Sequence, residues 1–379
     1  MNWLAFRMLT GDRGKYLGLI FGVAFATLLM SQQVSIFMGI IGRTASQILD
    51  VRDANIWVMD NKVRFIDEVP ALSDADLHRV RGVPGVEWAV RLYKGQLLAR
   101  LEDGNSRSLI VFGLDDATFV GAPAEMIVGK LSDLKQPDAV IVDKAGYEYM
   151  WPKEPYRLGR EMQINNRRAV LVGVCKASAP FTTLPVLFTR YSTAAGYVPN
   201  EGRLMSFVLA QSNEGLDATA VCKQIEQQTG LMALTRDQFF WKTVKYFLGS
   251  TGIPVNFGIT ITLGFIVGAA VTGQTFYLFT IENLRQFGAL KAMGVTNLRL
   301  VQMILLQGLL VGGSGYGIGV GLTALFFIGT NQVTVLAGLH MTWLAFAGTG
   351  AAVLLIITLT SLASMRRVLV LEPAIVFRG

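Results

Sequence analysis

Three long apolar runs dominate the pattern of hydrophobic and polar positions along the chain. Neither Tyr16–Ile41 nor Gly252–Phe279 contains a charged residue, and Val301–Leu362 contains no Asp, Glu, Lys or Arg. About 20 apolar residues cross the hydrocarbon core of a bilayer, so the last run is long enough to cross twice. The pattern therefore predicts transmembrane helices at residues 16–42, 252–281, 300–329 and 342–364.

The segment between the first two runs, residues 43–251, is mixed in character and is predicted to form a separate domain. Apolar stretches flank Asp103-Gly104-Asn105 and Asn165-Asn166, which indicates two β-hairpins. Ser73 with Asp76 three residues later is typical of a helix N-terminus. Further strands are expected at Asn55–Met59, Ala139–Val142 and Met205–Ala210, and a further helix at Leu216–Gln228.

A short polar connection, residues 282–299, separates the second apolar run from the third. It carries Arg285, Lys291 and Arg299 but only one carboxylate, that of Glu282. Short loops rich in lysine and arginine remain on the cytosolic side of a membrane. We therefore expect this loop to face the cytosol.

The other connections agree with this orientation. Residues 330–341 have no lysine or arginine, as expected of an outside loop, whereas Arg366 and Arg367 open a cytosolic tail at residues 365–379. Residues 1–15 predict a short interfacial helix on the cytosolic side. The predicted fold is an α-helical membrane domain with four transmembrane helices plus a large α+β extracytoplasmic domain inserted between helices 1 and 2.

Within residues 282–299 the apolar positions have a helical period. Leu284, Phe287, Leu290 and Met293 fall on one face, and Gly294 follows where a helix would end. An amphipathic helix at the membrane surface either lies among lipid headgroups or docks on a soluble partner. The periodicity alone leaves both interpretations open.

Glycines recur along one face of the predicted second and third spans. Small residues at such spacing let the backbone of a neighbouring helix approach closely. The spacing does not say whether that neighbour belongs to the same chain or to a second copy. The predicted packing residues are Gly264, Gly268, Gly308, Gly312, Gly315 and Gly319.

Residues 235–249 form an aromatic-rich amphipathic segment directly before the second span, with Phe239, Trp241 and Phe247 among its aromatic residues. One interpretation is an anchoring collar, because aromatic residues are enriched at the membrane interface. The other is a mechanical strut that continues into the span. Pro254 predicts a break between the two segments.

Composition supports a membrane protein. Of 379 residues, 52% are hydrophobic and only 16% are charged, so the net charge of +7 does not indicate a nucleic-acid partner. The cations cluster in part at the membrane flanks. Cys175 and Cys222 either pair outside the cytosol or remain free, and two free thiols are favoured because so sparse a pattern is no disulfide framework.

The chain carries no motif of a catalytic, cofactor or metal site. It has no G-x-x-x-x-G-K-[ST] nucleotide loop, no G-x-S-x-G and no H-E-x-x-H, and His78 and His340 are isolated. We expect no catalytic, cofactor-binding or metal-binding residues. Any ATP hydrolysis must be supplied by another polypeptide.

Two segments resemble a known family. The loop E-x-L-R-x-F-G-A-L-K-A-M-G and the ending M-R-R-V-L-V-L-E-P-A-I-V-F-R-G, with Glu372 and Pro373, resemble permeases of the MacB, FtsX and LolC/LolE family of ABC systems. The segment N-I-W-V-M-D is similar to the DevC-like branch. The resemblance implies that the loop holds a coupling helix seated on an ATPase subunit, which binds the ATP and magnesium. The implied coupling residues are Glu282, Arg285, Phe287, Leu290, Lys291, Met293 and Gly294.

The resemblance implies the membrane subunit of an ATP-driven exporter in the bacterial inner membrane. Two identical permease copies would pair with two ATPases. The permeases would also contact membrane lipid. DevC-like relatives also work with a membrane-fusion protein, and an outer-membrane channel would complete such an exporter. The alternative is an FtsX-like mechanotransmitter that regulates an extracytoplasmic enzyme without transport. The sequence does not identify a substrate.

Overall fold

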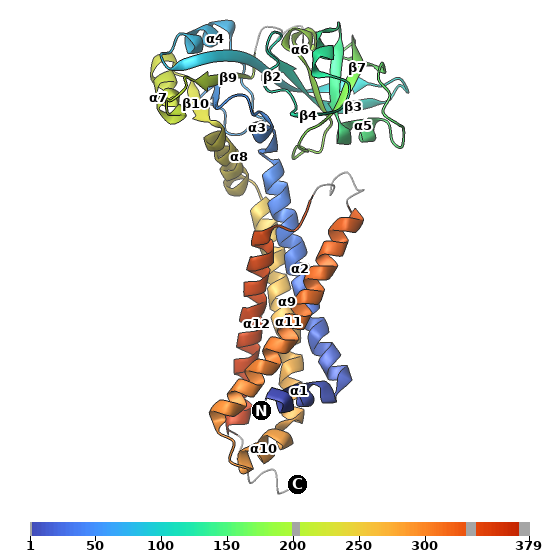
Figure 1. Ribbon diagram of the computed structural model, residues 1–379, viewed down its shortest axis with the longest axis vertical. Coiled ribbons are helices and arrows are strands. Elements are labelled where there is room, and N and C mark those ends of the chain that lie inside the picture. Colours follow the sequence, from blue (N-terminus) through green and yellow to red (C-terminus); the bar gives the residue numbers. More distant parts are fainter. Residues whose placement is uncertain (1, 199–204, 331–338, 371–379) are drawn as a thin grey trace. The chain divides into compact units, whose positions relative to one another are not determined.

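The computed structural model describes residues 2–198, 205–330 and 339–370, with side chains up to Met365 (Figure 1). The chain divides into two compact units. One contains Met1–Gly39 and Gly252–Gly379, and the other contains Ile40–Thr251. The predicted tail residues Glu372 and Pro373 lie outside the described residues, and so do the side chains of Arg366 and Arg367.

Among the described residues, four helices are long and apolar enough to cross a membrane. Helix α1 (Asn2–Gly11) precedes them, the second unit separates the first from the second in the chain, and α10 (Leu284–Ala292) lies between the second and third. At 1.5 Å per residue, a 30-residue helix such as α9 is about 45 Å long, which exceeds the hydrocarbon core. The four are α2 (Arg13–Arg43), α9 (Ile253–Glu282), α11 (Asn297–Thr330) and α12 (Trp343–Val370).

Three helix ends differ from the predicted bounds for local reasons. The chain breaks at Asp12, where the carboxylate accepts a hydrogen bond from the Lys15 amide (3.2 Å) and so caps α2 three residues earlier than expected. Helix α11 starts at Asn297, one turn early. Helix α12 continues to Val370, because Met365–Val370 contains neither glycine nor proline to stop it.

Glycines bring the four helices into close contact. A Cβ on Gly315 of α11 would lie 3.0 Å from the Ile20 carbonyl oxygen of α2. A Cβ on Gly319 would lie 2.6 Å from the Ala24 carbonyl oxygen of the same helix. Gly308 and Gly312 of α11 face Ile357 of α12. On α9, Gly264 and Gly268 face Met30 and Ala26 of α2. All the neighbours of the predicted packing glycines named here belong to the same chain.

The second unit contains one ten-stranded mixed sheet in the order β10-β1-β9-β2-β3-β8-β5-β7-β4, with β6 pairing β2 and β7. Strands β3 and β8, and β5 and β7, run parallel, whereas the other pairs are antiparallel. The strands are β1 (Ile56–Met59), β2 (Val86–Arg100), β3 (Ser106–Leu114), β4 (Glu125–Val128), β5 (Ala139–Asp143), β6 (Glu161–Ile164), β7 (Arg167–Lys176), β8 (Val186–Arg190), β9 (Phe207–Ser212) and β10 (Met232–Thr235). The helices are α3 (Ser46–Asp50), α4 (Asp74–Arg81), α5 (Lys144–Met150), α6 (Tyr191–Tyr197), α7 (Ala218–Thr229) and α8 (Arg236–Ser250), with a 3-10 turn at Leu131–Lys135.

The locally encoded elements of this unit are confirmed. Strands β2 and β3 form the first hairpin, and β6 and β7 form the second. Asn165 and Asn166 have φ values of 47° and 62°, as the second turn requires. Ser73 and Asp76 form a reciprocal capping box at the start of α4.

Helix α8 packs into the core of this unit through its aromatic residues. The Phe239 ring is fully buried, with ring centroids 5.4 Å from Trp57 and 5.7 Å from Phe207. One turn from its C-terminus, Phe247 contacts Phe65 and Phe181 at 5.4 and 5.3 Å. The predicted break follows at Thr251 and Gly252, and Pro254 lies in the first turn of α9.

A buried lysine holds the segment that carries Phe65. Lys94 on β2 is 4% exposed, and its ammonium donates to the Asp67 carboxylate and to the Ile66 carbonyl oxygen. Burial lowers the pKa of Lys94, and the Asp67 charge opposes that shift. The pair thus fixes the neighbouring Phe65 against α8.

Cys175 on β7 and Cys222 on α7 are both buried and free. Burial raises the pKa of both thiols, to about 12 for Cys222. A thiol with so high a pKa is a poor nucleophile at neutral pH. Two free thiols, the favoured sequence prediction, are what the structure contains.

Asp143 makes the stability of this unit depend on pH. Its carboxylate is 2% exposed and accepts hydrogen bonds from the Val186 and Gly146 amides, while burial raises its pKa to about 6. The folded state therefore binds a proton more readily than the unfolded chain, so this group's contribution falls as pH rises through 6. We expect the native protein to lose stability between pH 5 and pH 7.5 relative to Asp143→Asn, which lacks the titrating group. The extra loss in the free energy of unfolding should be about 1 kcal/mol. Denaturation followed by tryptophan fluorescence measures it, and equal pH dependence in the two proteins would contradict it.

Candidate coupling site between α9 and α11

The candidate site is the connection from the end of α9 to the start of α11. Asn283 closes α9 and opens α10, and its side-chain amide donates to the Phe279 carbonyl oxygen at 2.8 Å. Helix α10 then ends in a complete Schellman motif: the Gly294 amide donates to Lys291 O and the Val295 amide to Leu290 O, both at 3.1 Å. Gly294 has a φ of +88°, a conformation that favours glycine. Gly294 thus ends this nine-residue helix, while the Asn283 side chain caps the preceding helix α9.

The structure divides the predicted coupling residues into two sets. Phe287 (1% exposed) and Leu290 (8%) are buried in the four-helix unit. They pack in one cluster with residues of α1, α9 and α11, including Leu9, Phe279 and Leu300. The apolar face that the period identified therefore packs against the same chain.

The second set is available to a partner. Met293 is 73% exposed, and Arg285, like Gln286, is on the exposed face of α10. Leu298, in the first turn of α11, is 67% exposed and was not among the predicted residues. A bulky apolar residue within the polar stretch Thr296–Arg299 was the sequence signal for it. We call Met293 and Leu298, together with the exposed Arg285 of α10 and Arg299 of α11, the exposed tip.

Glu282 lies apart from the tip and takes part in an ion-pair network. Its carboxylate pairs with Lys15 at the start of α2, and Lys15 also pairs with Asp12 at 2.8 Å. The Lys15 and Glu282 side chains are 41% and 47% exposed, so the pair contributes little to stability. It joins the ends of α2 and α9 beside α10.

A polar groove of about 500 Å³ adjoins this network. Helix α1 forms one wall, and the junction of α9 and α10 forms the other. Helix α1 is itself fixed to α11, since the buried Gln307 amide donates to the Ala5 carbonyl oxygen at 2.9 Å. The groove residues are Leu4, Arg7, Met8, Gly11, Asp12, Lys15, Glu282, Asn283 and Gln286.

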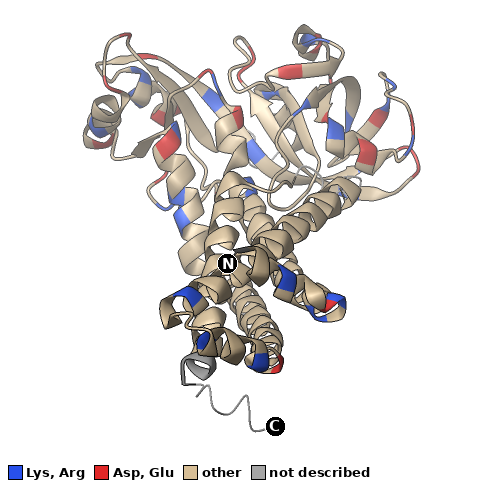
Figure 2. Ribbon diagram, turned by 60° about the horizontal axis from the view of Figure 1, so that its bottom comes forward, with Lys and Arg blue, Asp and Glu red and all other residues tan. Residues whose placement is uncertain are grey.

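The middle stretches of the four long helices carry no charge, and charged residues lie at the helix ends near α1 and α10 (Figure 2). Residues 1–15 and 282–299 contain two carboxylates, Asp12 and Glu282, among a larger number of cations. The cations are Arg7, Arg13, Lys15, Arg285, Lys291 and Arg299. This end of the unit is therefore strongly basic. Among the described residues, no group of three His, Cys, Asp or Glu side chains forms a metal site.

Comparison with known proteins identifies the family. Residues 16–228 match the MacB-like periplasmic core domain, and residues 258–373 match the FtsX-like permease C-terminal family. An uncharacterized ABC transporter permease of Mycobacterium tuberculosis is 31% identical over 317 residues, covering 83% of this chain and 81% of the relative. A Mycobacterium bovis permease matches at the same identity and coverage. A second M. tuberculosis permease is 24% identical over 326 residues, with coverage of 83% and 81%.

Two solved structures match part of the chain at low similarity. The periplasmic region of MacB from Actinobacillus actinomycetemcomitans has a TM-score of 0.40 and 14% identity, covering 54% of this chain and 96% of that chain. The extracellular domain of the transporter YknZ from Gram-positive bacteria has a TM-score of 0.36 and 14% identity, covering 48% and 98%.

These matches define a membrane protein of the ABC transporter permease class. The chain belongs to the family whose members combine a MacB-like periplasmic core domain with an FtsX-like permease C-terminal domain. The predicted resemblance is thereby confirmed. The relatives are permeases rather than enzymes, and membership implies a separate ATPase partner.

Proposed function

We propose that this chain is the membrane subunit of an ATP-driven exporter and that it converts ATPase movement in the cytosol into movement of an extracytoplasmic domain. The observation that carries this proposal is the exposed tip. The connection between α9 and α11 presents Met293, at the C-terminal end of α10, and Leu298, in the first turn of α11, to solvent, while the other face of α10 is buried in the four-helix unit. Exposed apolar residues on a rigid element are suited to binding a protein.

The charge distribution supports a cytosolic location for this tip. Positive residues predominate in residues 1–15 and 282–299, and lysine and arginine remain on the inside of bacterial membranes. With four membrane crossings, both termini then lie in the cytosol. The membrane is the bacterial inner membrane. The unit at residues 40–251, which follows α2 in the chain, lies outside.

The helix contacts support a direct route for force. Helix α10 follows α9, and α9 packs against α2 from Gly264 to the Lys15–Glu282 pair. Both α2 and α9 lead in sequence into the extracytoplasmic unit, α2 through Arg43 and α9 through α8. A push on the tip would therefore move α2 and α9 together. Two copies of the chain, each with one ATPase, would complete the assembly.

We expect Met293→Asp and Leu298→Asp each to reduce permease-stimulated ATP hydrolysis by roughly tenfold, because each removes an exposed apolar contact with the ATPase. Both side chains are largely exposed, so the permease itself should fold normally. The measurement is ATPase activity of the copurified complex in vesicles, together with the amount of ATPase that copurifies.

Two comparisons make this test specific. Leu216 in the other unit is 51% exposed, and Leu216→Asp should leave stimulation unchanged. Leu290→Asp should instead destabilise the permease, since it places a charge in the core. Normal stimulation in both Met293→Asp and Leu298→Asp would remove the tip from the mechanism.

The alternative, an FtsX-like mechanotransmitter that regulates an extracytoplasmic enzyme, shares the coupling step. It is favoured only by the FtsX-like match of the membrane half, residues 258–373. Copurification of a membrane-fusion protein and an outer-membrane channel supports export. Copurification of a cell-wall hydrolase supports regulation.

A further inference from the structure

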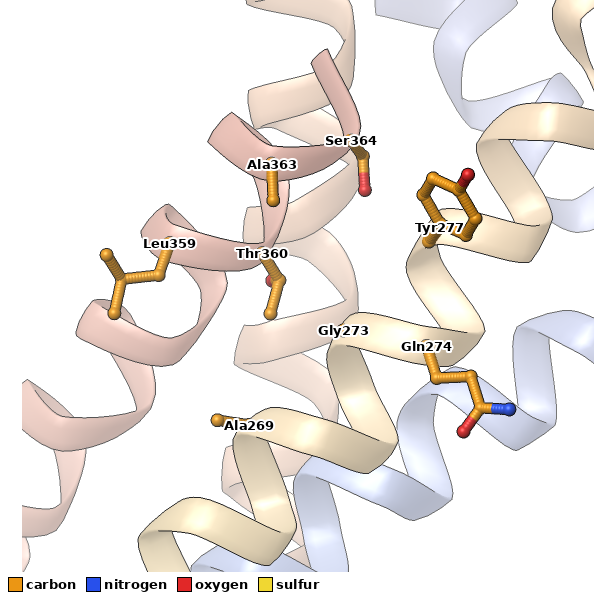
Figure 3. Close-up of a pocket in the computed structure, with 8 residues that line it drawn as sticks. All are labelled: Ala269, Gly273, Gln274, Tyr277, Leu359, Thr360, Ala363 and Ser364. Atoms are coloured by element: carbon orange, nitrogen blue, oxygen red, sulfur yellow. The ribbon is translucent and has the colours of Figure 1, made fainter. Parts of the chain in front are cut away.

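A second groove lies between α9 and α12, away from the coupling site (Figure 3). Its volume is about 430 Å³, within the range of small-molecule sites. The described residues that line it are Ala269, Gly273, Gln274, Tyr277, Leu359, Thr360, Ala363 and Ser364. No step of the proposed coupling mechanism uses this groove.

Small residues keep the groove open. A Cβ on Gly273 would come within 3.2 Å of the Thr360 methyl carbon, so a larger residue would close the floor. Large apolar side chains on other faces of α9 and α12 are also exposed, Val267, Leu278 and Leu362 by 43%, 50% and 57%. These surfaces are those of helices that face acyl chains.

The floor also holds an unsatisfied hydroxyl. The Ser364 side chain is 1% exposed, and its Oγ makes no hydrogen bond among the described residues. Two threonine hydroxyls of α12 bond to their own helix, since Thr349 and Thr358 donate to carbonyl oxygens four residues earlier at 2.8 and 2.7 Å, whereas the buried Ser361 hydroxyl, which faces Gly308 of α11, likewise has no partner among the described residues. Figure 3 shows the Ser364 hydroxyl on the side of α12 that faces α9. A buried donor aimed into a groove requires an acceptor there.

Two hydroxyls of the groove, those of Tyr277 and Ser364, lie at a similar depth. Tyr277 lies five residues, or about 7.5 Å, before the end of α9 at Glu282, and Ser364 lies one residue before the end of the apolar span of α12. Ala269, at the opposite end, is about 20 Å from Glu282. The groove therefore runs from the hydrocarbon boundary inward, with Tyr277 at the level that tyrosine prefers.

We propose that this groove binds one glycerophospholipid of the leaflet on the α10 side of the membrane. The hydroxyls of Ser364 and Tyr277 donate to the ester and phosphate oxygens, which only accept hydrogen bonds. One acyl chain lies along Ala269, Gly273 and Leu359. A helix from a second copy is a poorer match, because it would bring no row of acceptors to a single depth.

Two substitutions test the site by filling it or removing its donor. We expect Ala363→Leu to abolish retention of a tightly held phospholipid and Ser364→Ala to weaken retention about fivefold. The measurement is native mass spectrometry of the full chain after detergent purification, with added phosphatidylethanolamine and phosphatidylglycerol as probes. Ala351→Leu, at an exposed α12 position outside the groove, is the matched control and should bind as the native chain does.

Other outcomes overturn the proposal. Equal lipid retention in the native chain, Ala363→Leu and Ala351→Leu would show that the bound lipid lies elsewhere, and retention of detergent alone would show adventitious binding. If Ala363→Cys instead forms a disulfide between two copies in native membranes, the groove is a subunit interface. The site requires only the packing of α9 and α12, so its failure would leave the coupling proposal untouched.

Discussion

Gly319→Ala is expected to cost the four-helix unit about 2–3 kcal/mol of stability, although alanine is normally the better helix former. The new methyl carbon would lie 2.6 Å from the Ala24 carbonyl oxygen and 2.5 Å from the Thr27 Cβ, both in α2. Neither neighbour can rotate away, because one is backbone and the other a buried β-branched carbon. Helices α2 and α11 must therefore separate.

Gly321, two residues along the same helix, supplies the control. A Cβ there meets nothing within 4 Å, so Gly321→Ala should be neutral or stabilise by up to about 1 kcal/mol through helix propensity. Unfolding of both variants in mixed detergent micelles, followed by circular dichroism, measures the difference. Equal stability of the two variants would mean that α2 and α11 are not in contact at Gly319.

The sequence was sufficient to predict the four spans but not the partners of their glycines. Hydrophobic runs and charge asymmetry are local signals, and a helix in lipid satisfies its own backbone. Which helix each glycine faces depends on packing between distant segments. Gly18 and Gly22 of α2, which face Thr275 and Val271 of α9, were missed, although their spacing of four residues was visible.

The coupling site shows the same division between local and distant information. The Schellman motif at Gly294 follows from the glycine alone, and the helix of residues 284–292 from its period. The period, however, locates an apolar face without saying what covers it, and here it is the chain's own helices that cover Phe287 and Leu290. The Lys15–Glu282 pair joins residues 267 positions apart, so no spacing rule reveals it.

In the extracytoplasmic-type unit, hairpins were predictable and parallel pairs were not. Turn residues such as Asn165-Asn166 encode an adjacent antiparallel pair. The β3–β8 pair joins Ile110 to Val186 across a crossover, and nothing in either strand identifies the other. Strand β2 runs from Val86 to Arg100, well beyond the apolar stretch next to Asp103-Gly104-Asn105 on which the hairpin prediction was based.

The sequence leaves two interpretations of α8 open, and the burial of its aromatic rings bears on both. A collar in the headgroups needs its aromatic rings exposed, and Trp241 is 57% exposed. A strut needs rings locked into the domain it moves, and Phe239 is fully buried between Trp57 and Phe207. The packing of α8 on α3, β1 and β10 favours the strut interpretation.

Phe239→Ala should therefore lower the free energy of unfolding of this unit by about 3–5 kcal/mol, the usual effect of emptying a buried aromatic site. Trp241→Ala, on the same helix, removes an equally large but exposed ring and should cost no more than about 0.5 kcal/mol. Denaturant unfolding followed by near-ultraviolet circular dichroism, which reports the Trp57 environment, measures both. The collar interpretation predicts the reverse, with Trp241→Ala the more damaging variant in membranes.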